Sequence, residues 1–345
     1  MNGELLSLLR CPVTRSPLQL RTITSQSAPG ESVSEGILFA AEDWFYPVIG
    51  GIPRLTVEAF IDYAEFLQSH LTDYSARRRA LEEKYRRLIA YVQRKNKKTK
   101  ETFSLEWSLY NYTNDRTWGA EKQHLLPRFL EETGESEEGL SGKMIFDAGC
   151  GHGHLDSFIA AQGAKVIAMD LSNSIERAYQ QNTTPYAWFI QGDVQFPPVK
   201  PNAFDIVHCS GVLHHTNNTE LSFSCLEPCV RQGGVYSIWL YHSRKEKLHA
   251  VFNFFRGFTR RLPAKTVYFL LNYTLLPVTW AWKTIKGNRQ KKREMMIELM
   301  DWFSPEFRQE HEPDETAAWY AKRGYHSVTV TTWNSFGFNM TGRKG

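Results

Sequence analysis

Two aspartates and a run of glycines mark the part of this chain whose residue types and spacing could bind a nucleoside. The apolar run 144–146 ends at Asp147, and a second apolar run, 165–169, ends at Asp170. Between them, glycines stand at alternate positions: Gly149, Gly151 and Gly153. Strand, glycine turn, helix, strand and acid together form half of a mononucleotide-binding unit. Glycine lets the backbone turn tightly against a ligand, and the Asp170 carboxylate could accept both hydroxyl protons of a ribose.

The glycine spacing indicates which nucleoside is bound. A dinucleotide fingerprint, G-x-G-x-x-G, would place its third glycine at position 154, where this chain has His154. The observed G-x-G-x-G, led by an acid, resembles the first motif of class I S-adenosylmethionine (SAM) methyltransferases. In that family the glycine loop packs against the amino-acid end of SAM. The resemblance therefore implies SAM as the cofactor.

Further segments match the same family in the expected order. The run 186–190 predicts a third strand, and Asp193 follows it where the family has an acid that hydrogen-bonds the adenine amino group. The fourth strand, 203–209, leads into the segment 210–216, S-G-V-L-H-H-T, which resembles methyltransferases of ubiquinone and menaquinone biosynthesis. The resemblance implies these cofactor-binding residues: Asp147, Gly149, Cys150, Gly151, Gly153, Asp170, Leu171, Asp193, Val194 and Ser210.

The strand pattern predicts an α/β fold with the Rossmann-like, seven-stranded sheet of class I methyltransferases. Continuous apolar strands that alternate with helices indicate a parallel sheet covered on both faces. A fifth strand, 235–240, follows the turn 231–234, R-Q-G-G, where the family usually has K-P-G-G. The runs 325–333 and 336–343 match the antiparallel pair that completes the sheet. A ligand is then expected at the carboxyl ends of the parallel strands.

Residues 1–58 are predicted to form a small β-rich domain. This segment resembles the zinc-ribbon-like module of the tRNA-methyltransferase activator family, whose pattern opens with C-P-x-C. Here Cys11 is present, but Thr14 stands at the second cysteine position, and no other cysteine precedes Cys150. A four-thiolate zinc site cannot be assembled from these residues, so we expect a degenerate domain without metal. A docking or stabilising role is favoured over a catalytic one.

A helical linker, 59–100, is expected to join this domain to the methyltransferase domain, 101–345. Its basic runs 77–79, 86–87 and 94–98 favour a solvated helical face, with an RNA or phosphate contact as the alternative. The segment 103–108, F-S-L-E-W-S, together with Trp118-Gly119, resembles helices that lie over the SAM pocket in a set of bacterial methyltransferases. Ordinary aromatic core packing is the other interpretation.

An insertion at about 242–300 separates the fifth strand from the terminal strands. From Arg244 to Arg293 it holds thirteen Lys or Arg residues and one acid, Glu246. Its centre, 267–282, is almost wholly apolar, too short to span a bilayer and interrupted by Pro277. Basic flanks around an apolar centre suit a segment on an anionic membrane surface or a lid over an apolar substrate. The alternative is a helical cap whose apolar face packs on the core.

Composition indicates the class of protein and the compartment in which we expect it. A chain of 345 residues with 42% hydrophobic residues is globular, and its net charge of +4 does not by itself indicate a nucleic-acid partner. Five scattered cysteines favour a reducing compartment. We therefore expect a cytoplasmic protein without signal peptide, with peripheral contact at the inner face of the membrane through 244–293 as a further expectation.

Taken together, the residues predict a SAM-dependent methyltransferase (EC 2.1.1.-) that acts on a small-molecule or lipid-linked acceptor. His214 and His215 follow the fourth strand and are the candidate bases, although a pocket-lining or capping role is the alternative. No carboxylate trio for a metal stands out. The runner-up is an RNA methyltransferase, against which the absence of an Asn-Pro-Pro-Tyr type motif after the fourth strand counts. The third hypothesis is a non-catalytic protein that binds SAM. The sequence does not indicate the oligomeric state.

Overall fold

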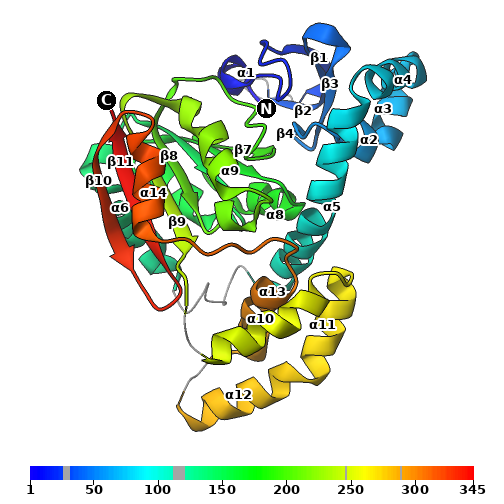
Figure 1. Ribbon diagram of the computed structural model, residues 1–345. Helices are drawn as coiled ribbons and strands as arrows, with labels where there is room; N and C mark the ends of the chain where they lie inside the picture. Colours follow the sequence, from blue (N-terminus) through cyan, green and yellow to red (C-terminus); the bar gives the residue numbers. More distant parts are fainter. Residues whose placement is uncertain (26–31, 112–120, 245–246, 288–289) are drawn as a thin grey trace.

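A seven-stranded sheet forms the centre of the protein, whose fold is described by a computed structural model covering residues 1–25, 32–111, 121–244, 247–287 and 290–345 (Figure 1). Its strands are β5 (Met144–Ala148), β6 (Lys165–Asp170), β7 (Ala187–Gln191), β8 (Phe204–Ser210), β9 (Val230–Tyr241), β10 (Tyr325–Trp333) and β11 (Gly337–Lys344). The order across the sheet is β10-β11-β9-β8-β5-β6-β7. Strand β11 is antiparallel to both of its neighbours, and the strands from β9 to β7 are parallel. The predicted α/β class and seven-stranded sheet are confirmed.

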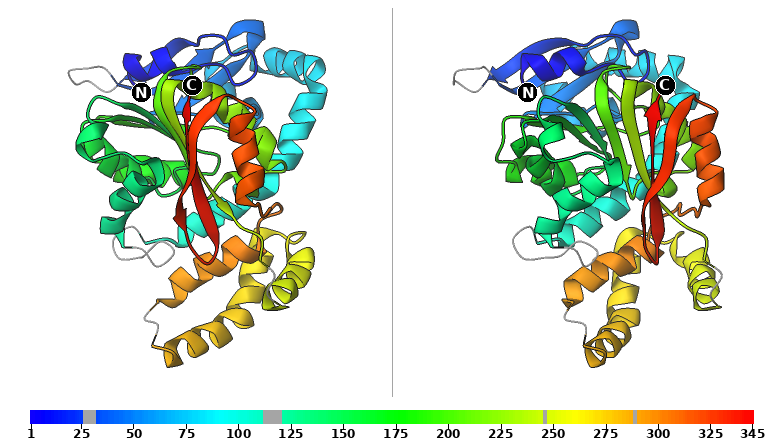
Figure 2. Two further views of the ribbon diagram at one scale, coloured as in Figure 1. Left: turned by 60° about the vertical axis from the view of Figure 1, so that its left-hand side comes forward. Right: turned by 90° about the vertical axis from the view of Figure 1, so that its left-hand side faces the viewer.

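Helices cover both faces of this sheet (Figures 1 and 2). Successive strand residues point to opposite faces, so Phe146 and Ile167 join one apolar cluster while Ile145 and Val166 join the other. The covering helices are α6 (Leu125–Thr133), α7 (His154–Ala161), α8 (Ser174–Gln181), α9 (Thr219–Leu226) and α14 (Pro313–Ala321). Short 3-10 helices lie at Lys122–His124, Glu138–Leu140, Leu213–His215 and Glu227–Cys229.

The N-terminal segment forms a separate four-stranded antiparallel sheet, as expected for a small β-rich domain. Its elements are α1 (Gly3–Leu8), β1 (Gln19–Ser25), β2 (Val33–Phe39), a 3-10 helix (Ala41–Asp43), β3 (Phe45–Ile49) and β4 (Ile52–Pro53). The Leu55 N–H donates to the Gln191 carbonyl at 2.7 Å, so the chain after β4 runs beside β7. Cys11 is buried, with its sulfur 3.2 Å from the Tyr46 hydroxyl. This cysteine therefore packs in the core of the small domain.

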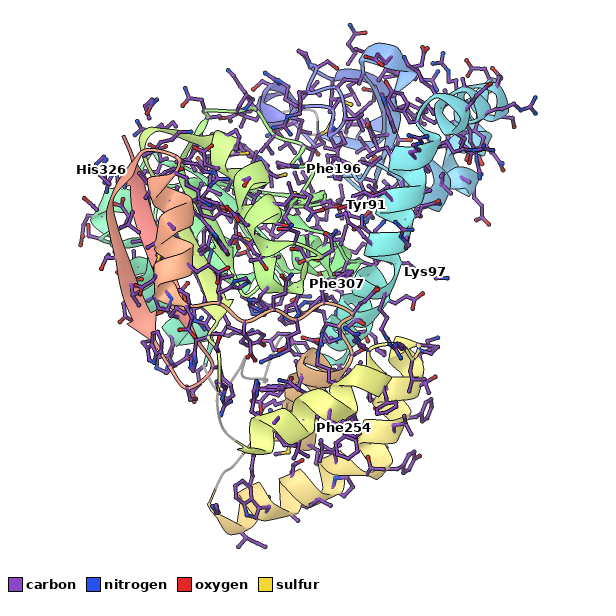
Figure 3. The ribbon with its side chains drawn as sticks, in the orientation of Figure 1. Tyr91, Lys97, Phe196, Phe254, Phe307 and His326 are labelled. Carbon is purple, nitrogen blue, oxygen red and sulfur yellow. The ribbon has the colours of Figure 1, made fainter. Side chains whose placement is uncertain are left out.

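Four helices connect the small domain to the rest of the chain: α2 (Ala59–Asp62), α3 (Ala64–His70), α4 (Tyr74–Lys84) and α5 (Arg86–Leu109). The long helix α5 runs from the small domain down the side of the central sheet (Figure 1). Its basic run is only partly solvated: Lys97 is exposed, as Figure 3 shows, whereas Lys95 is buried against Asp193. Lys100 pairs with Glu58 and Asp62. The expectation of a solvated face is therefore wrong for Lys95.

The insertion folds into a helical cap at one end of the molecule (Figures 1 and 2). Its helices are α10 (Lys247–Thr259), α11 (Ala264–Tyr273), α12 (Leu275–Ile285) and α13 (Lys292–Phe303). The apolar segment 267–282 is divided at Thr274, and Pro277 stands in the first turn of α12, where a backbone N–H has no intrahelical partner. Among the described residues, no helix combines the length and apolarity that crossing a bilayer requires.

Candidate active site

A cavity of about 590 Å³ lies at the carboxyl ends of the parallel strands and extends to the cap. Nine of the ten predicted cofactor-binding residues line it: Asp147, Gly149, Cys150, Gly151, Asp170, Leu171, Asp193, Val194 and Ser210. The tenth, Gly153, precedes α7 instead, and a Cβ there would come within 2.7 Å of the Ala178 side chain. The predicted residues thus gather at one site, and Gly153 shapes the loop from outside the lining.

Gly149 and Gly151 pack closely against side chains outside the glycine loop. Gly149 has a φ of 108°, and an added Cβ would lie 2.1 Å from a Val212 side-chain carbon. Gly151 has a φ of 54°, and its Cβ would lie 2.7 Å from the Trp107 ring. Both φ values lie in the region that favours glycine, so any side chain would strain the backbone and displace these neighbours. The loop is therefore held between α5 and the turn after β8.

Helix α5 covers the cavity with aromatic side chains. Phe103 and Trp107 both line it, and Trp107 is nearly buried against the glycine loop. The sequence left two interpretations of the segment 103–108: a helix over the pocket, or aromatic packing in the core. Trp107 fits both, because it lines the cavity and is buried. The remainder of that motif, Trp118-Gly119, falls outside the described residues.

Asp170 is held by donors from two loops. One carboxylate oxygen accepts the Gly151 N–H at 3.0 Å, and the other accepts the Ser172 N–H at 2.8 Å and the Ser172 hydroxyl at 2.6 Å. Burial raises the pKa of this carboxyl, and the Ser172 and Gly151 hydrogen bonds oppose the rise. The same bonds fix the orientation of the carboxylate at the cavity wall, where a ribose would need two acceptor oxygens.

Asp193 is paired with a buried lysine. The Lys95 ammonium lies 2.5 Å from one carboxylate oxygen, which also accepts from the Asn96 amide at 3.1 Å. The other oxygen accepts the Gln195 N–H at 2.9 Å. Burial alone would raise the pKa of Asp193, but the Lys95 charge and the hydrogen bonds from Lys95, Gln195 and Asn96 together outweigh burial, and the pKa is lowered. The carboxylate is therefore ionised and firmly held beside the predicted adenine position.

A buried chain of charged groups runs behind Asp147. The His208 ring lies between two carboxylates, with Nδ1 2.9 Å from Asp147 and Nε2 2.9 Å from Glu132. Arg128 donates to the other Glu132 oxygen at 2.7 Å. Burial alone would lower the pKa of His208, but the hydrogen bonds to Asp147 and Glu132 raise it to about 9. His208 is therefore an imidazolium that holds Asp147 in place at the end of β5.

The two candidate bases occupy different environments. His214 is buried, does not line the cavity, and has a pKa lowered well below its ordinary value by burial and by the neighbouring His215. His215 lines the cavity, with Nδ1 3.1 Å from the Phe307 carbonyl oxygen. Its Nε2 lies 3.2 Å from Asp301, at an angle that is not that of a hydrogen bond. Of the two histidines, only His215 lines the cavity, and its Nε2 is buried beside Asp301.

Asp301 was not predicted from the sequence, because it comes from the cap. It lies on α13 and accepts a hydrogen bond from the Tyr241 hydroxyl at the end of β9. Burial would raise its pKa, but His215 and Tyr241 outweigh burial, and the pKa is lowered. Lys95 and His208 were likewise missed. A histidine inside an otherwise apolar parallel strand was the one local signal that could have pointed to His208.

Within the described ranges, no three His, Cys, Asp or Glu side chains come together as a set of metal ligands. The carboxylates at the cavity are instead engaged by protein groups: Asp147 by His208, Asp170 by Ser172, and Asp193 by Lys95. These contacts give each of the three carboxylates a partner from the protein itself. The expectation of a site without metal remains a prediction, which a metal analysis must test.

Comparisons with known proteins agree with the geometry of the central domain. Residues 146–238 match the family described as "Methyltransferase domain". The ubiquinone biosynthesis O-methyltransferase of Vibrio atlanticus is 30% identical over 122 residues, which are 34% of this chain and 52% of that protein. An uncharacterized methyltransferase of Synechocystis is 30% identical over 123 residues, which are 35% of this chain and 54% of that protein. The chain thus spans about half the length of these relatives.

Among solved structures, magnesium protoporphyrin IX methyltransferase from Synechocystis with bound S-adenosylhomocysteine covers 72% of this chain and 98% of its own, at 15% identity and a TM-score of 0.45. The family match and the curated relatives confirm the prediction of a methyltransferase domain that uses SAM. The family match covers the glycine loop and the parallel strands, from within β5 to within β9.

Proposed function

We propose that this chain, whose central domain is that of a class I SAM-dependent methyltransferase, methylates a small-molecule or lipid-linked acceptor. One observation carries the proposal: a single cavity connects Asp170 at the sheet with apolar side chains of the cap, among them Phe252 and Trp282. The proposed cofactor-binding residues and the apolar side chains of the cap thus line the same cavity. An apolar acceptor would lie against the cap, with its reacting atom toward the sheet.

The residues present fit the cofactor. Asp170 offers carboxylate oxygens for ribose hydroxyls, Asp193 offers an ionised acceptor for the adenine amino group, and the glycine loop brings its backbone to the cavity wall. When bound, SAM supplies an electrophilic methyl group on a sulfonium. The protein must then align the acceptor with that methyl and exclude water. Phe103 and Trp107 on α5 cover the cavity and contribute to the exclusion.

A hydroxyl or carbon-acid acceptor must lose a proton as it is methylated, and we propose that His215 takes it. The Phe307 carbonyl fixes the Nδ1–H tautomer, which leaves the Nε2 lone pair as the proton acceptor. Asp301, 3.2 Å from Nε2, would stabilise the imidazolium that results. The proton passes from the acceptor to Nε2, and no metal is needed for this step.

The basic residues that suggested an RNA acceptor are poorly placed to bring RNA to the cavity. Lys95 is in a buried ion pair with Asp193. The arginines of α4, 77–79, lie at the opposite end of the molecule from the cap (Figures 1 and 2). An RNA held by α4 would therefore approach the protein far from the apolar wall of the cavity. This arrangement favours the small or lipid-linked acceptor over the RNA alternative.

Incubation with methyl-labelled SAM and fractionated cell extract tests the proposal. We expect label in the lipid or small-molecule fraction, and its loss in Asp170→Ala, which removes the proposed ribose acceptor. Label in RNA would instead establish the runner-up function. Normal SAM binding without label in any fraction would point to a non-catalytic protein.

A further inference from the structure

The cap exposes apolar side chains on three helices at one end of the molecule. We call these residues the cap face: Val251, Phe254, Phe255, Phe258, Phe269, Leu270, Tyr273, Val278, Trp282 and Ile285. On α10 they fall at i, i+3, i+4 and i+7, which is one continuous stripe of a helix. Phe254 is 65% exposed, Tyr273 75% and Ile285 86%. Figure 3 shows Phe254 on α10 within this end of the molecule.

The cap does not need these side chains for its own packing. A different set of apolar residues, including Val267, Leu271 and Leu276, is buried against Met295 and Met300 of α13. Helices α11 and α12 are thus apolar both toward the protein and away from it. A surface helix normally has one apolar stripe, and it faces the core. Exposed apolar surface in addition to that stripe marks a place where a protein binds a partner or a membrane.

The three helices that carry the cap face contain basic residues but no acidic one, and Lys283 of α12 pairs with Glu298 of α13 at 3.1 Å. From Lys247 to Arg293 the sequence has no acidic residue. Exposed basic residues stand at the turn between α10 and α11: Arg260, Arg261 and Lys265. At the far end of α12, the Lys286 ammonium lies 4.1 Å from the centre of the Trp282 ring, which is itself 57% exposed. Apolar side chains bordered by cations and an exposed tryptophan match the chemistry of an anionic bilayer surface.

The cavity reaches the same end of the molecule. Its lining includes Phe252 of α10, Trp282 of α12 and Phe336 in the turn between β10 and β11. Trp282 belongs both to this lining and to the cap face. Trp333, at the end of β10, adds a further aromatic ring that is 58% exposed. The apolar wall of the cavity is therefore continuous with the exposed apolar surface of the cap.

We propose that the cap face docks on an anionic lipid bilayer and that the acceptor reaches the cavity from the membrane. Docking is argued from the surface alone, whereas the route of the acceptor rests on the proposed methyltransferase function. The exposed rings would enter the interface between headgroups and acyl chains, and Arg260, Arg261 and Lys265 would contact the headgroups. An apolar acceptor could then pass along Trp282 without crossing water.

Co-sedimentation with vesicles tests the docking. We expect binding to phosphatidylcholine vesicles that contain phosphatidylglycerol, hardly any to phosphatidylcholine alone, and weakening by salt. The double variant Phe254→Ser with Tyr273→Ser should reduce binding at least about tenfold, because two exposed rings no longer transfer into the interface. Tyr186→Ser with Leu221→Ser is the matched control, since both residues are exposed but lie outside the cap.

Charge reversals give a second, independent readout. Arg260→Glu with Lys265→Glu should lower binding to the anionic vesicles by about tenfold or more, whereas Arg79→Glu with Arg87→Glu should have little effect. Equal losses in both pairs, or a protein that stays in the supernatant at low salt, would overturn the proposal. A dimer that Phe254→Ser dissociates would overturn it too, since the cap face would then belong to a second copy. SAM binding, measured by calorimetry on the same samples, separates failed docking from failed function.

Discussion

The Asp301 carboxylate lies 3.2 Å from Nε2 of His215 at the boundary between the cap and the sheet. The Tyr241 hydroxyl donates to the same carboxylate, and the Phe103 ring lies edge-on to the imidazole, with ring centres 5.2 Å apart. The cap therefore supplies a buried charge to the histidine that follows β8. This contact links the insertion to the proposed chemistry and makes the cap part of the site.

Asp170→Ala is expected to weaken SAM binding about ten- to a hundredfold. The substitution removes a carboxylate that would accept hydrogen bonds from the ribose, and a charge-assisted bond contributes roughly 1.5–3 kcal/mol. Calorimetric titration with SAM measures the change, with Glu65→Ala, an exposed carboxylate on α3, as the control. Equal affinities for the two variants would remove Asp170 from the cofactor site.

Lys95→Met is expected to lower the free energy of unfolding by about 3–5 kcal/mol, because it leaves the buried Asp193 carboxylate without its cation. Two residues along α5, Lys97 is exposed, so Lys97→Met should change stability by no more than about 0.5 kcal/mol. Denaturant unfolding of the two variants makes the comparison. Similar unfolding midpoints would mean that the Lys95–Asp193 pair does not stabilise the fold.

The His208 imidazolium predicts a loss of stability at alkaline pH. Its folded pKa of about 9 lies above the ordinary value of 6.5, so its contribution is fully present below pH 6.5 and is lost as the pH rises through 9. The largest possible contribution is about 3 kcal/mol. Unfolding free energies of wild type and His208→Asn, measured from pH 6 to 10, should differ in slope within this window. Parallel curves would mean that His208 is not charged in the folded protein.

The small N-terminal domain is expected to contain well under one zinc per chain. Thr14 occupies the position of the second cysteine, and Cys11 packs its sulfur against the Tyr46 hydroxyl. Elemental analysis of protein purified without a metal-binding tag gives the zinc content directly. A stoichiometric amount would mean that ligands outside this segment had been overlooked, and Cys11→Ala would then show whether its thiol takes part.

The parts predicted correctly from the sequence are those that neighbouring residues determine. Apolar runs define the strands, and the residues after them, such as Asp147 and Asp170, necessarily reach the same edge of a parallel sheet. Lys95 was misjudged because its burial depends on Asp193, which is distant in sequence but adjacent in the fold. The apolar stretch of the insertion was open to two interpretations. Leu276 is buried in the cap, as a helical cap requires, whereas Phe269 is exposed, and contact with a membrane stays a prediction.

The His215–Asp301 pair is expected to govern the rate of methyl transfer without affecting cofactor affinity. His215→Asn removes the proposed proton acceptor, and general-base catalysis contributes typically about 10²–10⁴-fold. Asp301→Asn keeps the shape of the carboxyl but removes the charge that would stabilise the imidazolium, so its loss should be smaller. The readout is the rate of label transfer from SAM into the fraction that the wild type methylates, at saturating SAM.

Two further measurements distinguish this role from a structural one. His214→Asn serves as the matched control, because its ring is adjacent but does not line the cavity. SAM affinity should remain unchanged in all three variants, and the rate in Asp301→Asn should depend on pH differently from that of the wild type, because the charge beside His215 is gone. If Asp301→Asn and His215→Asn transfer label at the wild-type rate, the acceptor needs no base, as expected for a nitrogen or sulfur nucleophile that binds deprotonated. The pair would then only fasten α13 of the cap to the chain after β8.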